Sequence, residues 1–488
     1  MKLDQLKLDI DYFDFDKKFY HISNATPLEK PYLIAFSKSA CDLINLDYKE
    51  CQSDNFIKFV NGEKILKGSI PYAMAYAGHQ FGYFVPQLGD GRALNLGSIN
   101  GWHLQTKGSG ITKYSRQGDG RAVLSSSIRE FIISEHMHAL GIPTTRALAL
   151  IGSKQKVSRG YFDTQSAAIV LRLSPSWIRI GTFEFFARGK DAQKNLIQLT
   201  NYVIKQSYSD LENIENRKQR YEKFFYQLVD KTAKLMAQWM AYGFMHGVMN
   251  TDNMSVDGLS IDYGPFAFMD NFEKHCICNH TDIEGRYSFN NQPSIAKWNL
   301  EVLAYSLGKI CSFPKLMEYL KGFEKIHQKE YLKIINMRLG LDINNCGDSN
   351  LELVMDLLSS LELSKCDYNG FFYRLSKLDS LADFSYILDL TIDPKPLHLW
   401  LIKYKNVIEQ SDQNFKEKQK QMQKINPKYI IKNYMLQEAI ENAQNGDFTL
   451  VNDLLNIAQN PFDEHKDFEK YTKSTPLEYV NIKLSCSS

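Results

Sequence analysis

Residues 259–270 read LSIDYGPFAFMD, a stretch that joins a strand signal to a possible ligand site. Its first three residues predict a short apolar strand, which ends at the acidic residue Asp262 and a Tyr-Gly pair. Just upstream, residues 246–254 read HGVMNTDNM and include Asp252 and Asn253. Carboxylate and amide oxygens suit Mg²⁺, which takes few protein ligands. The alternative is an ordinary turn, but an acid directly after a strand favours a magnesium-nucleotide site with Asn253 and Asp262 as metal ligands.

The chain changes character at about residue 190. Before that point glycines and short β-like runs dominate, and the alternation in GWHLQTKG predicts a strand over residues 102–107. Apolar spacing predicts a helix within residues 121–140, which Gly141 stops. After about residue 195 the pattern is mostly helical, beginning with a long helix over 221–243. We therefore expect a strand-rich N-terminal lobe, a helix-rich C-terminal lobe and a ligand cleft between them.

Residues in the N-terminal part match the other parts of a phosphoryl-transfer site. Such a site needs a glycine-rich turn, a strand lysine, a helix acid that orients the lysine, and metal ligands. The turn QLGDGRALNLG supplies Gly89, Gly91 and Arg92, Lys107 ends the predicted strand, and Glu130 lies mid-helix. Each feature also has an ordinary structural explanation: the glycines can form a hairpin turn, Lys107 can be a solvated strand residue, and Glu130 can be a surface acid. Their order along the chain favours the nucleotide site.

One residue in the glycine turn does not suit a phosphate loop. The carboxylate of Asp90 would repel an anion placed directly over it. The pentapeptide GDGRA also occurs a second time, at 118–122, where it opens the predicted Glu130 helix. A helix N-terminus at that point could receive an anion, with Asp119 and Gly120 beside it. The two copies can also be coincidence.

Two arginines flank a Ser-Pro turn in RLSPSWIR. Arg172 and Arg179 can each bind phosphate oxygens in a bidentate fork, so the pair could clamp a polyphosphate tail. HGVMNTDNM resembles the catalytic loop of kinase-fold phosphotransferases, and DYG resembles their metal-binding D-F-G motif. The chain departs from that pattern at Val248, where the usual catalytic aspartate is missing. Asp252 is the nearest replacement carboxylate.

Composition excludes several classes of protein. The 488 residues carry a formal net charge of +2, which gives no case for nucleic acid as the main partner. The sequence has no run of about 18 apolar residues, so it predicts no membrane helix, and the N-terminus lacks an apolar signal core. Eight cysteines in this length do not form a disulfide framework, and Cys276 and Cys278 lack a second pair with zinc spacing. We expect a cytoplasmic protein without a membrane partner.

Long motifs resemble the selenoprotein O family over nearly the whole chain. They are YAGHQFG, QLGDGRALNLG, LQTKGSG, YSRQGDGRAVLSSSIREF, RLSPSWIRIGTFEFFA, HGVMNTDNMSVDGLSIDYGPFAFMD and NPKYIIKNYMLQEAIENA. The resemblance implies an α+β, protein-kinase-like two-lobed fold with a strand-rich N-lobe, a helical C-lobe and a helical C-terminal extension. Four segments follow from it: an N-terminal extension (1–70), the N-lobe (71–190), the C-lobe with the catalytic and metal motifs (191–400), and a helical extension with a redox tail (401–488).

The resemblance also implies an activity, protein adenylylation. AMP would pass from ATP to the hydroxyl groups of Ser, Thr or Tyr in substrate proteins, with release of pyrophosphate. ATP would bind inverted relative to ordinary kinases, with Mg²⁺ or Mn²⁺ on Asn253 and Asp262. Asp252 would accept the proton and Glu130 would orient Lys107. The implied nucleotide contacts are Gly89, Gly91, Arg92, Lys107, Asp119, Gly120, Arg172, Arg179 and Asp262.

The family resemblance implies a redox-active residue near the C-terminus. Cys486 lies at that place, and Cys278 in CICNHTD resembles its partner, with Cys276 as a rival. Cysteine at this place, without a presequence, favours a bacterial cytoplasmic enzyme, which we expect to be a monomer. Three other functions stay open at this point: an ordinary γ-phosphate kinase, an ATP-binding pseudokinase scaffold and a thiol redox protein.

Overall fold

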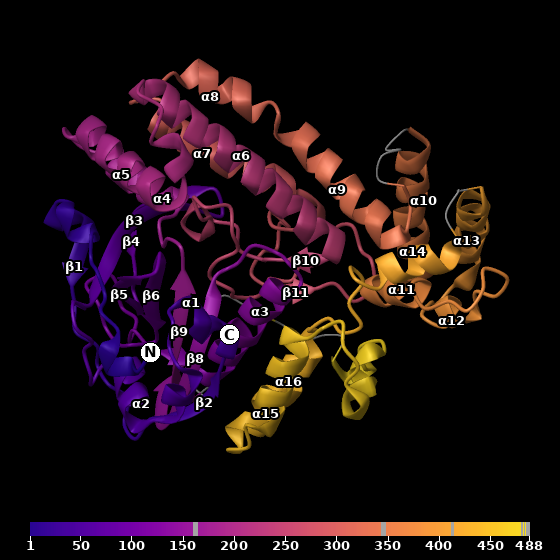
Figure 1. The fold of residues 1–488 in the computed structure, drawn as a ribbon, viewed down its shortest axis with the longest axis horizontal. Helices are drawn as coiled ribbons and strands as arrows, with labels where there is room; N and C mark the ends of the chain where they lie inside the picture. Colours follow the sequence, from indigo (N-terminus) through magenta and orange to yellow (C-terminus); the bar gives the residue numbers. More distant parts are fainter. Residues whose placement is uncertain (160–163, 343–347, 411–413, 480–481, 483, 485–488) are drawn as a thin grey trace.

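The structure is a computed structural model of the 488-residue chain. It describes residues 1–159, 164–342, 348–410, 414–479, 482 and 484. The strands gather in the N-terminal third, and helices make up most of the rest (Figure 1). The chain is therefore a mixed α/β protein with an antiparallel sheet at its N-terminal end, as the sequence predicted.

Within the part of the chain that the structure describes, the main sheet has nine strands, and all its pairings are antiparallel. Its order is β1-β3-β5-β6-β9-β8-β2, while β4 pairs with β3 and β7 pairs with β9. The predicted strand is confirmed as β6, between β5 and β9. The strands are β1 (Tyr20–Ile22), β2 (Tyr32–Phe36), β3 (Tyr72–Gln80), β4 (Tyr83–Gly89), β5 (Ala93–Ile99), β6 (Trp102–Lys107), β7 (Ala122–Val123), β8 (Arg146–Ser158) and β9 (Thr164–Ser174).

The helix that carries Glu130 packs across this sheet. It is α3 (Leu124–Ala139), close to the predicted bounds, and its apolar residues are buried against β8, β9 and the C-terminal helix α16 (Thr449–Gln459). The other helices of the N-terminal half are α1 (Lys38–Leu43), α2 (Asp54–Asn61), α4 (Ile180–Phe186), α5 (Ala192–Ser207) and α6 (Arg217–Tyr242). The long helix predicted over 221–243 is therefore confirmed as part of α6.

The C-terminal half is helical, as predicted. Its helices are α7 (Gln292–Leu307), α8 (Phe313–Leu320), α9 (Phe323–Leu339), α10 (Asp348–Ser364), α11 (Tyr368–Leu375), α12 (Ser385–Leu388), α13 (Pro394–Glu409), α14 (Phe415–Met422), α15 (Asn433–Gln444) and α16 (Thr449–Gln459). The last two return to the N-terminal part, where α16 lies along α3 (Figure 1). The end of the chain therefore covers the helix that carries Glu130.

One local expectation needs revision. The predicted strand over residues 259–261 is wrong, because Ser260 makes only an isolated bridge with Thr144. The segment is instead held by burial and by the indole of Trp239, which donates a hydrogen bond to Ser260 Oγ at 2.9 Å. The segment 1–70 also contributes to the sheet, since β1 pairs with β3 and β2 pairs with β8. It is therefore packed into the same structure as the strands that follow.

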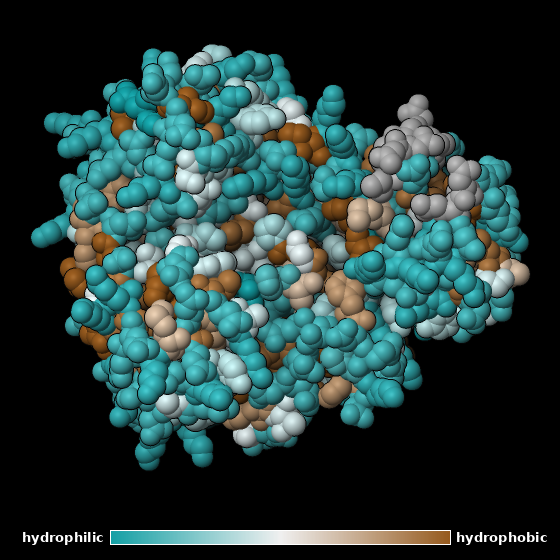
Figure 2. All heavy atoms as spheres, viewed as in Figure 1, coloured by the Kyte–Doolittle hydropathy of each residue, from teal (hydrophilic) through white to brown (hydrophobic). Residues whose placement is uncertain are grey.

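The visible face of the molecule is mostly hydrophilic, with small, scattered apolar patches (Figure 2). Within the described residues, no helix combines the length and apolarity needed to cross a bilayer.

Candidate active site

A pocket of about 590 Å³ contains the residues predicted to bind the nucleotide. Both copies of GDGRA line it, so the repeat brings two loops to one cavity. Residues from the N-terminal sheet and from the loop after Asp262 complete the wall. The lining residues are Tyr76, Gly89, Asp90, Gly91, Arg92, Ala93, Lys107, Tyr114, Ser115, Arg116, Gln117, Gly118, Asp119, Gly120, Arg121, Ser158, Arg159, Arg172, Arg179, Val248, Asn253, Asp262, Tyr263, Gly264 and Pro265.

The lysine and the helix acid form the predicted pair. Lys107 Nζ lies 2.7 Å from Glu130 Oε2 and 3.7 Å from Asp262 Oδ1. Glu130 is almost fully buried behind the lysine and does not itself line the pocket. The strand and the helix therefore place the ammonium group between an acid of α3 and the acid of the DYG motif.

The two predicted arginines converge on the same aspartate. Arg172 Nη1 lies 2.6 Å from Glu130 Oε1 and 2.7 Å from Asp262 Oδ1, and its Nη2 donates to Gln105 Oε1. Arg179 Nη1 lies 2.7 Å from Asp262 Oδ2. Both guanidinium groups are buried at 2% exposure. One carboxylate, Asp262, thus contacts three cations at the inner end of the pocket.

The buried cations keep the two carboxylates of this cluster ionised. Burial would raise the pKa of Asp262, but Arg179, Arg172 and Lys107 outweigh it and hold that pKa well below its usual range. Burial likewise opposes ionisation of Glu130, and Lys107 and Arg172 again leave its pKa lowered. Burial lowers the pKa of Lys107 despite the nearby acids. The cluster is therefore a preformed arrangement of cations around two ionised carboxylates.

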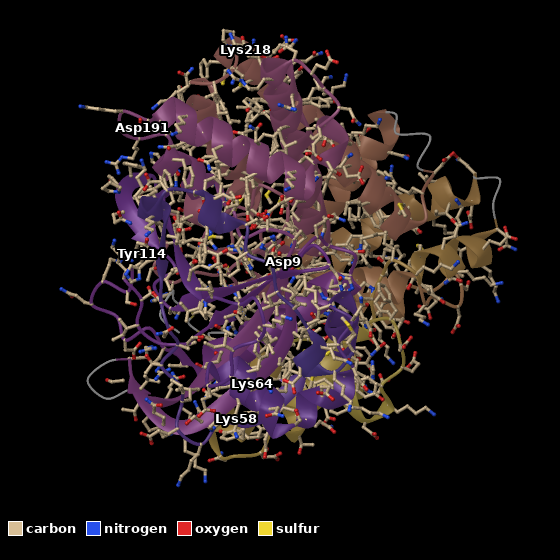
Figure 3. All side chains as sticks on the ribbon, turned by 60° about the vertical axis from the view of Figure 1, so that its left-hand side comes forward. Asp9, Lys58, Lys64, Tyr114, Asp191 and Lys218 are labelled. Carbon is tan, nitrogen blue, oxygen red and sulfur yellow. The ribbon has the colours of Figure 1, made fainter. Side chains whose placement is uncertain are left out.

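Asp90 is turned inward and serves the loop structure. Its Oδ2 accepts hydrogen bonds from Met74 N at 2.9 Å and from Asn95 Nδ2 at 2.8 Å, and the side chain is 4% exposed. The ring of Tyr114 covers Gly89 so closely that a Cβ there would lie 2.4 Å from Cγ of the ring. Tyr114 lies on the second glycine loop, between β6 and β7, and is labelled in Figure 3. The glycine is needed for this close packing, and the acid is largely shielded from a ligand.

The second glycine loop is joined to the first. The Thr112 hydroxyl donates to Asp90 O at 2.7 Å, and the Ser115 hydroxyl donates to Gly91 O. Asp119 lies at the exposed rim, where Oδ2 is 2.8 Å from Arg159 Nη1. Gly120 has a φ of +67° and leaves no room for a Cβ beside Gly110. The two loops therefore form one continuous wall.

The Asp-Asn pair divides between the pocket and its surroundings. Asn253 lines the pocket with Val248, and its Nδ2 donates to Val248 O at 3.2 Å. Asp252, the predicted proton acceptor, is not one of the described residues that line this pocket. Gln80 Nε2 donates to its Oδ2 at 3.2 Å, and burial raises the pKa of Asp252 to about 6. The predicted acceptor thus lies behind the pocket wall, under the β3–β4 hairpin.

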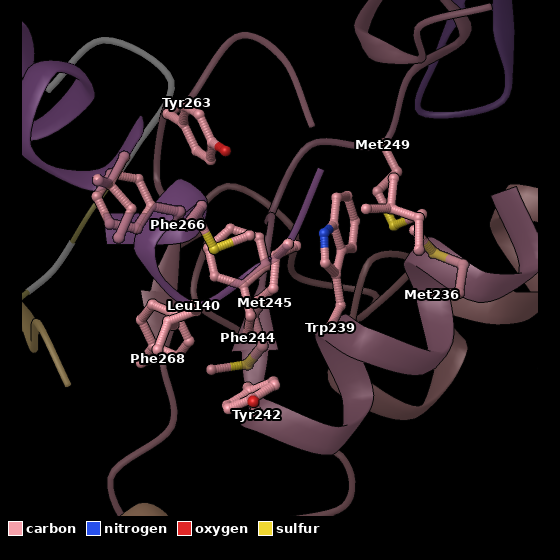
Figure 4. Close-up of a cluster of buried hydrophobic side chains, with 14 of the residues drawn as sticks. Leu140, Met236, Trp239, Tyr242, Phe244, Met245, Met249, Tyr263, Phe266 and Phe268 are labelled. Atoms are coloured by element: carbon pink, nitrogen blue, oxygen red, sulfur yellow. The ribbon is translucent and has the colours of Figure 1, made fainter. Parts of the chain in front are cut away.

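A hydrophobic cluster anchors the loops that carry these residues (Figure 4). Tyr263, directly after Asp262, is buried with Phe244 and Phe266. His246 stacks on Trp239 with ring centres 5.4 Å apart, and its Nε2 bonds to the carbonyl of Ile261 at 2.8 Å. Packing of aromatic side chains, rather than a regular strand, therefore fixes the DYG segment.

The proposed redox pair can be placed only in part. Cys278 is partly buried, its Sγ lies 3.7 Å from Met245 O, and burial raises its thiol pKa. Cys486 lies outside the described residues, so the Cys278–Cys486 pairing stays a prediction. Within the described part of the chain no cluster of His, Cys, Asp or Glu could hold a metal by itself.

Three cationic residues of the pocket were missed by the sequence reasoning. Arg116, Arg121 and Arg159 all line it. Arg121 stands in the second GDGRA, so the repeat carried a signal that could have identified it. Arg116 and Arg159 stand alone in polar stretches and gave no local signal. They reach the pocket only because the second loop and the β8–β9 hairpin fold against each other.

Comparison with known proteins identifies the family. The model of the family described as protein adenylyltransferase SelO matches residues 3–459. The protein nucleotidyltransferase YdiU of Thiobacillus denitrificans is 41% identical over 494 residues, with 100% of this chain and 99% of that protein covered. The YdiU proteins of Myxococcus xanthus and Pseudomonas aeruginosa are 40% and 39% identical, with 99% of each covered. This chain therefore belongs to the SelO family of protein adenylyltransferases.

Proposed function

We propose that the pocket between the two glycine loops and the DYG segment binds ATP, and that AMP passes from it to hydroxyl side chains of proteins. The observation that carries this proposal is the convergence of Lys107, Arg172 and Arg179 at the inner end of the pocket. Buried cations of this kind suit a triphosphate tail, and they stabilise the charge that develops on a pyrophosphate leaving group. An ATP molecule inverted relative to kinases would place its tail there and leave the α-phosphate toward the acceptor.

The glycine loops would hold the rest of the nucleotide. Gly89, Gly91 and Arg92 of the first loop and Asp119 and Gly120 of the second line the same cavity. Because the glycines carry no side chain, the backbone of both loops can approach a ligand closely. Because the carboxylate of Asp90 is bonded inward, it does not oppose an anion as its position in the sequence suggests.

Asn253 and Asp262 are the proposed metal ligands. Both line the pocket, and Asn253 uses only its amide nitrogen in the bond to Val248 that the structure gives it. One carboxylate and one amide oxygen match Mg²⁺ or Mn²⁺, which completes its coordination with water and substrate phosphates. The ion would neutralise phosphate charge when bound. Glu130 would hold Lys107 in place through their 2.7 Å contact.

The transfer step would use Asp252 as proton acceptor. The acceptor oxygen would form a bond to the α-phosphorus while the bond from that phosphorus to the bridging oxygen of pyrophosphate breaks. The hydroxyl proton would pass to the Asp252 carboxylate. Val248 stands where a kinase carries its catalytic acid, and it lines the pocket as an apolar residue. That substitution supports adenylyl transfer over ordinary γ-phosphate transfer.

A protein-kinase-like fold is also part of this proposal. The Lys107–Glu130 pair, the sheet and the helical C-terminal half support such a fold. We retain the predicted division into 1–70, 71–190, 191–400 and 401–488 as a working description.

ATP labelled separately on the α- or γ-phosphate tests the proposal. Purified protein would be incubated with Mg²⁺ and each label, under reducing and non-reducing conditions, and label in protein would be measured. We expect transfer from the α-phosphate only. Transfer from the γ-phosphate only would make the protein a kinase. ATP binding without transfer in either redox state would make it a nucleotide-binding scaffold.

A further inference from the structure

The tip of the β3–β4 hairpin lies on the loop that carries Asp252. His79 N donates to Thr251 Oγ1 at 2.7 Å, and Phe81 N donates to Asn250 Oδ1 at 3.1 Å. Between them, Gln80 Nε2 donates to Asp252 Oδ2 at 3.2 Å. Three consecutive residues of the hairpin therefore bond to three consecutive residues of the loop.

The backbone of the hairpin tip is strained to reach this position. Phe81 has a φ of +51° and Gly82 a φ of +87°, which is the left-handed pattern of a tight two-residue hairpin turn. A positive φ is unusual for a bulky residue and persists only where surrounding contacts impose it. Here the Phe81 N–H also has a second acceptor, since it donates to Tyr287 OH at 3.0 Å. The tip is thus held against the loop from several sides.

Strand β3 and Asp252 lie so close together that only glycine fits at position 78. A Cβ at Gly78 would lie 2.6 Å from Asp252 Oδ1. That oxygen is buried and has no hydrogen-bond partner among the described residues, whereas Oδ2 accepts from Gln80. An unpaired buried acceptor is costly, and a catalytic role is one of the reasons for which such an atom is kept.

We propose that Gln80 is a positioning residue for adenylyl transfer, because its amide holds Oδ2 of Asp252, the proposed proton acceptor, and so fixes the orientation of that carboxylate. This role rests on the proposed function. An amide donor fixes the carboxylate plane without a charge of its own, so it orients Asp252 and leaves the cation cluster around Asp262 unchanged. A misplacement of about 1 Å at a reacting group costs on the order of a hundredfold in rate.

The test replaces the amide and keeps the shape. Gln80→Met removes the donor, and Gln87→Met is the matched control, because Gln87 lies on the same hairpin and bonds to its neighbour Leu88 O. The measurements are α-label transfer from ATP at saturating and limiting ATP, and the melting temperature. We expect kcat to fall about ten- to a hundredfold in Gln80→Met, with KM for ATP within about twofold of wild type. Gln87→Met should match wild type.

A second measurement separates positioning from a general structural role. In an Asp252→Asn background, Gln80→Met should lower the residual transfer by less than about twofold, because the group that it positions is already impaired. An equal loss in both backgrounds would overturn the proposal, as would wild-type or raised kcat in the single variant. Wild-type protein that transfers no α-label would overturn the proposed function itself and this role with it. A fall in kcat in Gln80→Met, with Gln87→Met at the wild-type level and little further loss in the Asp252→Asn background, therefore supports the positioning role.

Discussion

Glu130 and Asp262 share one cation, because Nη1 of Arg172 lies 2.6 Å from the first carboxylate and 2.7 Å from the second. Glu130 lies on α3, and Asp262 lies in the irregular segment that follows α6. A single buried guanidinium therefore couples the sheet-packed helix to the proposed metal ligand. Because Nη2 of Arg172 donates to Gln105 Oε1, the planar fork contacts three side chains at once.

Arg172→Lys should impair this coupling despite the retained charge. A lysine offers one compact ammonium group and cannot reproduce the fork that reaches Glu130, Asp262 and Gln105 together. We expect kcat/KM for ATP in α-label transfer to fall by about tenfold or more. Arg188→Lys is the control, since Arg188 is exposed and donates to the carbonyl of Pro86. Equal activity in both variants would show that only the charge at 172 matters.

Asp262→Asn should abolish transfer and preserve the local backbone. Asp262 has a φ of +55°, a conformation that asparagine adopts more readily than most residues. The substitution removes the negative charge that faces Arg172, Arg179 and Lys107 and weakens metal binding. We expect α-label transfer to fall more than about a hundredfold, on the scale of losing one electrostatic stabiliser. Far-ultraviolet circular dichroism should match wild type. Transfer at the wild-type level would contradict the assignment of Asp262 to the metal.

Local patterns predicted the elements, while the site depends on contacts between them. The period of residues 121–140 and the alternation of 102–107 placed Glu130 on a helix and Lys107 on a strand, because those signals lie within one element. The inward turn of Asp90 could not be predicted, because it depends on Met74 and Asn95 of neighbouring strands. The strand predicted before Asp262 failed for a related reason: a run of three residues with two apolar side chains fits a strand or an irregular buried segment equally well, and aromatic packing decided between them.

The contacts of α3 with the C-terminal helices give a stability prediction. Glu135 accepts from Arg146 Nε at 2.8 Å and Nη2 at 2.7 Å, and from Gln459 of α16 at 3.0 Å. Glu135→Gln removes the charge and leaves Arg146 buried, so the free energy of unfolding should fall by about 3–5 kcal/mol. Asp230→Asn, at the more exposed Lys234 pair on α6, should cost less than about 1 kcal/mol. Urea unfolding measures both. A similar small cost at the two sites would show that the α3–α16 junction tolerates an unpaired arginine.

His136, the next residue of α3, should make this junction sensitive to acid. Its Nδ1 lies 3.1 Å from the carbonyl of Ala458, and the backbone N–H of Ile431 donates to its Nε2 at 3.3 Å. The ring must therefore be neutral, since a proton on Nε2 would face another donor. Burial lowers the pKa of His136 to about 4 from its ordinary value of 6.5.

The sign of the pH effect follows from that lowered pKa. Between pH 6.5 and about 4 the unfolded chain binds a proton at His136 that the folded chain does not, so stability falls as the pH falls through this window. At pH 5 the His136 contribution should be smaller by about 2 kcal/mol than at pH 8. Because other groups also titrate, the quantity to measure is the difference in unfolding free energy between wild type and His136→Gln at both pH values. That difference should shift by about 2 kcal/mol in favour of the variant at pH 5. A difference that does not change with pH would mean that His136 takes up its proton as readily in the folded chain as in the unfolded chain, and that its bonds to Ile431 and Ala458 do not require the neutral ring.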